Sequence, residues 1–308
     1  MIIARIIPHA GLGNQMFMYA AGLSAASRLG TELRLGAWNW EHLSTPDRPF
    51  HLWEFPQITE RNASFLETLK IVPKQAVMNA IYYKPVEKHH VFRRAVRKLC
   101  RCIPSRLWQA IERMYAQKSP GYEPEFEHIQ DNTFTSGYFE SEKYFAGIKD
   151  LVRKKFTFPQ EYFDPELSHI MRGCNSVALH VRRTDKVRED DSRASNLPYI
   201  TCALDKMKSL TENPVFFVFS DDIEWCRENL PKVSDEDYRF VEGRTPPQDM
   251  ALMTICRHII TGPSTFSWWG AWLNGNPDKI IITPNVSQRK RDAAGKQDFI
   301  PSSWIMLA

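Results

Sequence analysis

The second half of the chain alternates short apolar runs with segments of helical spacing, and this rhythm limits the possible folds more than any other feature. The apolar runs cover residues 176–181, 215–219, 238–241, 258–261 and 279–283, and the helical segments cover residues 199–210, 222–229, 248–256 and 264–273. Strands separated by helices pair in parallel, because each helix returns the chain to the edge where the next strand begins. The pattern therefore predicts a doubly wound α/β domain.

The first residues predict a second unit of related architecture. Residues 2–7 form a β-branched apolar run, and residues 14–29 have helical spacing up to Gly30, which suits a helix C-cap. Residues 31–35 resemble the next strand, whereas residues 38–131 predict helices and long loops. Because 308 residues exceed one compact core, we expect two domains, 1–165 and 166–308, with the hinge around Pro159 and Pro165.

Composition places the chain among ordinary globular proteins. Hydrophobic residues make up 43% and charged residues 25%, and a net charge of +4 is too small to indicate a nucleic-acid partner. Seven cations without one carboxylate alternate with apolar residues between positions 88 and 106: Lys88, Arg93, Arg94, Arg97, Lys98, Arg101 and Arg106. This stretch predicts a basic amphipathic helix, which either packs on the first domain or contacts an anionic membrane.

Cysteine usage and the amino terminus predict a cytoplasmic protein. The six cysteines lack the density of a disulfide framework and the spacing of a zinc site, so reduced thiols are expected. The chain runs from Met1 through a short apolar segment into Pro8, with no signal-peptide cleavage site and no apolar stretch of membrane-spanning length.

Polar residues follow the predicted strands at the ends where α/β sheets bind ligands. The strand at 176–181 contains His180 and runs into Arg182 and Arg183, with Asp185 close behind. Guanidinium groups offer paired donors to phosphate oxygens, so the two arginines suit a diphosphate. The alternative is a surface ion pair between Asp185 and one arginine.

The strand at 258–261 runs through a tight turn into a helix. Ser264 or Thr265 is the expected N-cap, and hydroxyls with backbone N–H groups at a helix start bind anions. We expect this turn to hold the same diphosphate, whereas Trp268, Trp269 and Trp272 serve the core.

Two carboxylates, Asp221 and Asp222, follow the strand at 215–219. One is expected to accept hydrogen bonds from a base edge or a ribose, and the other to cap the next helix.

The opening loop contains Gly11, Gly13, Asn14 and Gln15, but Met16 stands where the dinucleotide fingerprint needs its third glycine. Its glycines still let a ligand approach the backbone, and its two amides can hydrogen-bond sugar hydroxyls.

These segments, taken in order, resemble the α-1,2-fucosyltransferases of glycosyltransferase family 11. The resemblance rests on residues 11–17, residues 137–145 (GYFESEKYF), the His180-x-Arg-Arg-x-Asp185 motif, Ser220-Asp221-Asp222 and residues 267–274 (SWWGAWLN). It implies a GT-B-like α/β fold in which two Rossmann-like domains face each other across a cleft. The amino-terminal domain would then bind the acceptor, and the carboxy-terminal domain would bind GDP-fucose.

The resemblance also implies residue roles. Arg182, with Arg183, would neutralise the departing GDP. Ser264, Thr265 and Phe266 would hold its phosphates. His180, with Asp221 or Asp222, would meet the guanine. Thr184 stands where the family usually has glycine, and residues 261–265 replace its asparagine and paired serines, but neither departure removes a positive charge.

The implied reaction is an inverting transfer of L-fucose to the 2-hydroxyl of a terminal β-galactoside in an oligosaccharide or surface glycan, including a lipid-linked one. No metal-binding carboxylate motif is apparent, so no cofactor is expected. Asp185, His9 and Glu140 are the residues considered as general base. The alternatives are a GT-B enzyme with another nucleotide sugar or fucose linkage, and a non-catalytic carbohydrate-binding protein.

Overall fold

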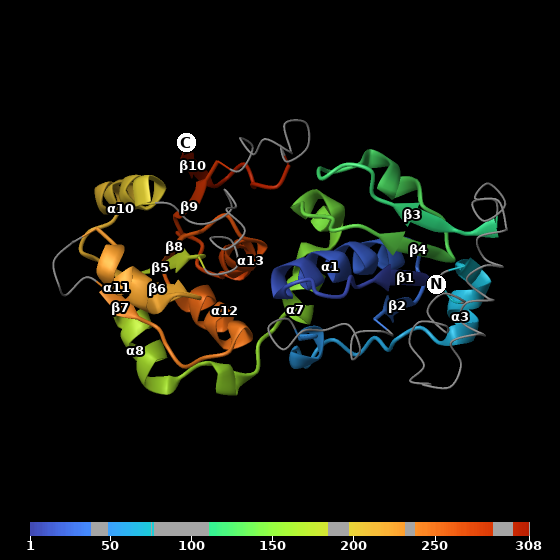
Figure 1. Ribbon diagram of the computed structural model, residues 1–308, viewed down its shortest axis with the longest axis horizontal. Helices are drawn as coiled ribbons and strands as arrows, with labels where there is room; N and C mark the ends of the chain where they lie inside the picture. Colours follow the sequence, from blue (N-terminus) through green and yellow to red (C-terminus); the bar gives the residue numbers. More distant parts are fainter. Residues whose placement is uncertain are drawn as a thin grey trace, which may run out of the picture. The chain divides into compact units, whose positions relative to one another are not determined.

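The computed structural model describes residues 1–37, 49–74, 76, 111–183, 197–231, 238–285 and 298–307. The chain divides into two compact units, one of Met1–Leu52 with Ile58–Val152 and one of Trp53–Gln57 with Arg153–Ala308. Each unit holds one sheet in which every described strand pairing is parallel (Figure 1). The α/β class expected from the sequence is confirmed.

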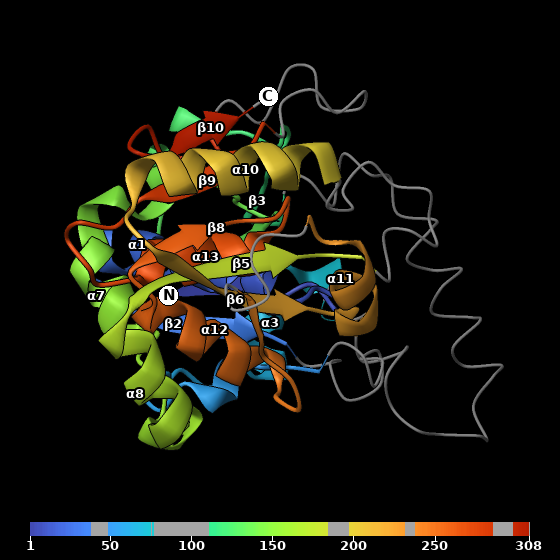
Figure 2. The same ribbon diagram turned by 90° about the vertical axis from the view of Figure 1, so that its left-hand side faces the viewer.

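The sheet of the second unit has the order of a doubly wound domain. Its strands are β5 (Asn175–Val181), β6 (Pro214–Ser220), β7 (Tyr238–Phe240), β8 (His258–Ile260), β9 (Ile281–Pro284) and β10 (Ile305–Leu307). They lie in the order β10-β9-β8-β5-β6-β7, and the central strands can be followed from top to bottom in Figure 2. The strand order reverses between β5 and β8, which is where such sheets bind ligands.

Helices cover both faces of this sheet. They are α8 (Pro165–Gly173), α10 (Leu197–Leu210), α11 (Ile223–Asn229), α12 (Pro246–Ile255) and α13 (Thr265–Leu273). Alternate residues of β5 and β6, among them Val177, Leu179 and Val218, share a core with α10 and α11. Helices α12 and α13 pack together on the opposite face (Figure 1).

The tryptophans of α13 belong to the core, as the sequence predicted. Trp268 and Trp269 are at most 1% exposed and Trp272 is 4% exposed. The indole N–H of Trp268 donates to the carbonyl of Phe299 at 2.7 Å, which satisfies its buried polar group.

The first unit carries four parallel strands in the order β2-β1-β4-β3. These are β1 (Ile2–Arg5), β2 (Leu33–Gly36), β3 (Met114–Ala116) and β4 (Thr133–Ser136), with helices α1 (Leu12–Arg28) and α3 (Phe65–Ile71). The predicted opening βαβ unit is therefore present. Strand β3 lies within the stretch expected to contain only helices and loops, which corrects that expectation.

Helix α1 lies unusually close to strand β1. A Cβ atom added to Gly22 would stand 2.5 Å from the Cβ of Ala4, so only glycine fits at this crossing. Short helices complete the described chain: η1 (Leu52–Glu54), η2 (Pro124–His128), η3 (Glu142–Ile148), α7 (Lys149–Lys155) and η4 (Gln160–Tyr162).

The second unit begins inside α7, ahead of the prolines that suggested a boundary at residue 165. The cause is aromatic packing, because Phe55 lies 5.1 Å from both Phe156 and Phe158 between ring centroids. Phe156 in turn packs on Trp269 of α13 at 5.1 Å. These rings draw residues 53–57 and 153–158 into the second unit.

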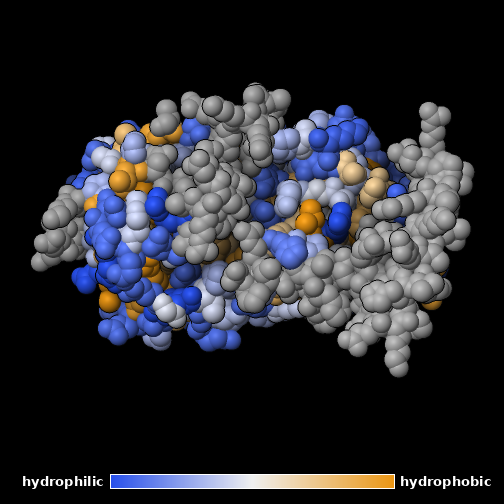
Figure 3. Space-filling view, in the orientation of Figure 1, coloured by the Kyte–Doolittle hydropathy of each residue, from blue (hydrophilic) through white to orange (hydrophobic). Residues whose placement is uncertain are grey.

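The described surface is largely hydrophilic, with small apolar spots rather than one broad patch on the face shown in Figure 3. Among the helices that the structure describes, none combines the length and apolarity needed to cross a bilayer. The described cysteines, Cys174, Cys202, Cys226 and Cys256, are unpaired thiols. The predicted basic helix at residues 88–106 lies outside the described residues.

Candidate functional site

The polar residues predicted to bind a ligand gather at the carboxyl ends of β5, β6 and β8. These three strands are adjacent in the sheet, and β5 pairs with both β6 and β8. Their carboxyl ends therefore meet at one edge, on either side of the point where the strand order reverses. We call this edge the switch-point edge.

Arg182 joins two of these strands at the switch-point edge. Its guanidinium Nη1 donates to the hydroxyl of Ser264 at 3.3 Å. The Ser264 hydroxyl also accepts the backbone N–H of Phe266 at 3.2 Å and so caps α13, whose first residue is Thr265. A guanidinium and a helix start thus supply positive potential to the same place, as the sequence predicted for a phosphate group.

Arg183 points away from Arg182, because successive residues beyond a strand face opposite sides of the sheet. Its guanidinium carbon lies 3.7 Å from the ring centroid of Trp225 in α11. Its backbone N–H donates to the Asp221 carboxylate at 2.8 Å. The two guanidinium groups therefore contact different helices, Arg182 at the start of α13 and Arg183 at Trp225 of α11, and the binding of a diphosphate by Arg183 stays a prediction.

His180 is a neutral residue beneath this site. Its ring is 9% exposed and lies 5.3 Å from the ring of Phe266 between centroids. Burial lowers the pKa of His180 to about 4, with Asp221 opposing the shift and Arg182 adding to it. Its Nδ1 is buried and has no hydrogen-bond partner among the described residues.

The two carboxylates after β6 have separate roles. Asp222 is the N-cap of α11, where it accepts the backbone N–H of Trp225 at 3.2 Å. Capping is one of the two roles expected for this pair, and a contact of Asp222 with the donor stays a prediction. Asp221 remains exposed at the switch-point edge.

The opening loop of the first unit is held by one of the residues expected to touch a ligand. The Gln15 amide N–H groups donate to the carbonyls of Ala10 and Pro49, both at 2.9 Å, and its oxygen accepts the His51 N–H at 3.0 Å. Because Gln15 is completely buried, it serves the loop rather than a ligand, which corrects the expectation for this residue.

The neighbours of Gln15 keep positions compatible with binding. Gly11 is the N-cap of α1 and Gly13 lies in its first turn. The side-chain oxygen of Asn14 is buried without a hydrogen-bond partner among the described residues, so an acceptor for a hydroxyl is in place there.

Comparison with known proteins gives the family. The model of glycosyl transferase family 11 matches residues 62–308. The chain belongs to this family. It is 30% identical to an α-1,2-colitosyltransferase from Escherichia coli, over 99% of this chain and 98% of that protein. It is 31% identical to the galactoside α-(1,2)-fucosyltransferase 1 of Saimiri boliviensis boliviensis, over 46% of this chain and 42% of that protein.

Among solved structures, one similar to this family 11 chain is the NodZ α-1,6-fucosyltransferase soaked with GDP-fucose. The two structures align over 94% of this chain and 96% of the NodZ chain. The sequence identity is 16% and the TM-score 0.48. Family membership makes the chain a glycosyltransferase, so the prediction of an enzyme is confirmed over that of a non-catalytic binding protein.

The structure shows a buried titratable residue in the second unit that the sequence did not single out. Asp249 lies in the first turn of α12, which returns the chain from β7 to the start of β8. Burial raises the pKa of Asp249 to about 7 against the pull of Arg244, and its Oδ1 has no described hydrogen-bond partner. In sequence it looks like any acidic residue in a first helical turn, so no pattern could have identified it.

A second overlooked residue shapes the turn before α13. The hydroxyl of Tyr199 in α10 donates to the carbonyl of Thr261 at 2.8 Å. This bond reaches from α10 to the end of β8 and fixes the chain that leads to Ser264.

Asp185 and Thr184 lie outside the described residues. Within the described parts of the chain, no three His, Cys, Asp or Glu residues come together as a metal site would require.

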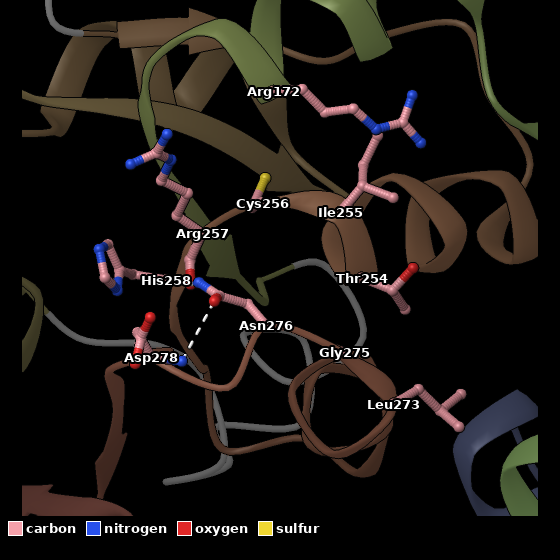
Figure 4. Close-up of a pocket in the computed structure, with 10 residues that line it drawn as sticks. All are labelled: Arg172, Thr254, Ile255, Cys256, Arg257, His258, Leu273, Gly275, Asn276 and Asp278. Carbon is pink, nitrogen blue, oxygen red and sulfur yellow. Dashed lines mark hydrogen bonds between the residues drawn. The ribbon is translucent and has the colours of Figure 1, made fainter.

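A pocket of about 650 Å³ lies at the opposite edge of the same sheet (Figure 4). Arg172, Arg257 and His258 line it where α8 and α12 end and β8 begins. It contains none of the residues of the switch-point edge.

Proposed function

We propose that this enzyme transfers L-fucose from GDP-fucose to the 2-hydroxyl of a terminal β-galactoside, forming an α-1,2 linkage with inversion. The observation that carries this proposal is the meeting of Arg182 with the capped start of α13 at the switch point. A diphosphate fits that arrangement. The α-1,2 linkage follows the names of the relatives, and one of these acts on galactosides by name.

The site suits a leaving group that gains charge. As the bond between fucose C1 and the β-phosphate oxygen breaks, negative charge builds on the diphosphate, and Arg182 with the α13 N–H groups stabilises it. The acceptor oxygen bonds to C1 from the opposite face, and its proton passes to a base. Asp185, His9 and Glu140 remain the residues proposed for this role.

Guanine recognition is proposed for His180 and Asp221. His180 is neutral at physiological pH, so one ring nitrogen can donate and the other accept. Asp221 offers an exposed carboxylate to the N1–H and 2-amino donors of guanine.

The decisive experiment is a linkage assay. The enzyme is incubated with GDP-fucose and lactose, N-acetyllactosamine or galactosyl-N-acetylgalactosamine, and the product linkage is determined by NMR. An α-1,2-fucosyl product is expected with at least one acceptor. Transfer to none of them, or a different linkage, would overturn the proposal.

A second donor has a specific observation in its favour, the 30% identity to a colitosyltransferase over 99% of the chain. Colitose is fucose without its 3-hydroxyl, so the two donors present the same diphosphate to Arg182. Competition between GDP-colitose and GDP-fucose in one reaction measures the ratio of kcat/KM values and decides between them.

We further propose that transfer needs no divalent metal, because Arg182 and the helix start supply fixed positive charge. Full activity is expected in excess EDTA, although divalent ions can still speed GDP release. Loss of activity that manganese or magnesium restores would contradict this.

We also propose that the enzyme is cytoplasmic and that residues 88–106 hold it loosely on an anionic membrane, near a lipid-linked acceptor. Each surface lysine or arginine contributes on the order of 1 kcal/mol of attraction to anionic lipid. Wild type should co-sediment with anionic vesicles at low salt, and a variant with Arg93, Arg94, Arg97 and Lys98 changed to glutamine should not. Equal, negligible binding by both would mean that the segment packs on protein instead.

A further inference from the structure

The first unit has its own switch point, at the carboxyl ends of β1 and β4. These strands are hydrogen-bonded neighbours, and the Arg5 guanidinium donates to the Ser136 hydroxyl at 3.2 Å where both strands end. Two residues proposed as general base, His9 and Glu140, lie in the loops that follow β1 and β4. Ligands bind at such edges in α/β folds, so these two loops lie where a ligand of the first unit would be held.

The loop after β4 makes a turn that its residues do not favour. Phe139 has a φ of 52°, a left-handed conformation that is costly for a bulky side chain. Gly137 precedes it, and an added Cβ would stand 2.5 Å from the Cβ of Gln117. The backbone is thus forced into one tight path.

Gln117 holds this turn in place. Its side-chain oxygen accepts the backbone N–H groups of Tyr138 and Phe139 at 3.0 and 2.9 Å. Its amide donates to the carbonyl of Gly121 and the hydroxyl of Tyr144. The Gln117 side chain therefore fixes the backbone of Tyr138 and Phe139.

The result of this turn is an aromatic ring presented to solvent. Phe139 points into the core and is 1% exposed, whereas the neighbouring Tyr138 is 44% exposed. Because Gln117 already fixes the backbone that carries Tyr138, only the ring itself has to be ordered when something packs on it. The turn thus presents Tyr138 to solvent in the loop that follows β4.

We propose that Tyr138 is the platform on which the galactosyl ring of the acceptor stacks. This rests on the proposed function. A β-galactoside has one apolar face, formed by the C–H groups at C3, C4 and C5, which complements the electron-rich face of a phenol ring. Stacking on that face leaves the 2-hydroxyl at the edge of the sugar ring, open to reaction.

The test separates acceptor binding from donor chemistry. Tyr138→Leu keeps an apolar side chain but removes the aromatic face, and Tyr138→Phe keeps the face. For Tyr138→Leu we expect the acceptor KM to rise about tenfold, a loss of the size that an aromatic contact provides. The GDP-fucose KM, the slow hydrolysis of GDP-fucose without acceptor and kcat at saturating acceptor should stay within twofold. Tyr138→Phe should retain the wild-type acceptor KM.

Phe65→Leu is the matched control, since Phe65 is 49% exposed in the same unit but lies on α3. An unchanged acceptor KM in Tyr138→Leu would overturn the platform while leaving the transferase proposal intact. Equal losses in Phe65→Leu would also overturn it, because the effect would then not be specific to this loop. Absence of transfer by the wild type to any galactoside would instead refute the proposed function, and the platform with it.

Discussion

The two edges of the second unit's sheet use the same residue type in opposite ways. At the switch-point edge, Arg182 lies beside the start of α13, so both contribute positive potential. At the other edge, Arg172 stands in the last turn of α8, and Arg257 follows the end of α12. There the cations offset the partial negative charge of helix carbonyl ends. In this sheet an arginine indicates an anion site only where the nearest helix terminus is also positive, that is, an N-terminus.

The largest effect that would test this comparison is expected from Arg182→Ala. It removes the charge that the departing diphosphate needs most, so kcat/KM should fall by about a hundredfold or more. Arg257→Ala is the matched control at the opposite edge, where the side chain donates to Asn175 at 3.1 Å. Steady-state kinetics with GDP-fucose and thermal unfolding of both variants provide the measurement.

The contrast between the two edges would be wrong if Arg182→Ala and Arg257→Ala lost equal activity while both stayed folded. It would also fail if Arg182→Ala kept wild-type turnover and GDP affinity.

A pH experiment contrasts a buried carboxylate of the second unit, Asp249, with an exposed one, Asp278. Its pKa is about 7 in the folded state, above the 3.8 of an ordinary aspartate, so the fold disfavours the charged form. The contribution of Asp249 to the free energy of unfolding is therefore at its maximum below pH 4 and decreases as the pH rises to 7. Asp249→Asn should escape this decline and be about 4 kcal/mol more stable than wild type at pH 8, with little difference at pH 4.

Urea unfolding at pH 4, 6 and 8 measures the effect. Asp278→Asn is the control, because that carboxylate is exposed at the opposite edge. Parallel stability curves for wild type and Asp249→Asn would show that the buried carboxylate carries no such penalty.

A smaller effect is expected from Arg183→Ala. The cation–π contact with Trp225 should be worth about 1 kcal/mol, so the melting temperature should fall by a few degrees. Because this side chain points away from Ser264, kcat/KM should fall by less than tenfold. A decrease in kcat/KM as large as that of Arg182→Ala would show that both arginines bind the diphosphate.

Strands β5 to β9 and helices α10 to α13 were predictable because each has one period of hydrophobicity and a clear boundary, whereas helix α8 and the three-residue strand β10 were not predicted. Ser264 and Asp222 were predictable as N-caps for the same reason, since small polar residues before an apolar helix have few other uses. Strand β3 was not, because three residues, one half-buried and two exposed, carry no alternating pattern.

The site itself was predictable only in part. The sequence puts Arg182 and Arg183 next to each other, but strand alternation sends them to opposite faces, and the contact partners Ser264 and Trp225 decide their roles. Gln15 and Asp249 show the same limit. Their burial depends on residues far away in sequence, such as Pro49 for Gln15.

The placement of residues 53–57 in the second unit has a practical consequence for dissecting the enzyme. A fragment that starts at residue 153 would lack Phe55, which is 1% exposed in the whole protein, and would open the packing around Phe156 and Phe158 to water. It would also lose the hydrogen bond from Tyr162 to Glu54 at 2.8 Å. Loss of one buried phenylalanine alone costs about 3 kcal/mol. Such a truncation should aggregate unless a peptide spanning Trp53–Gln57 is added in trans.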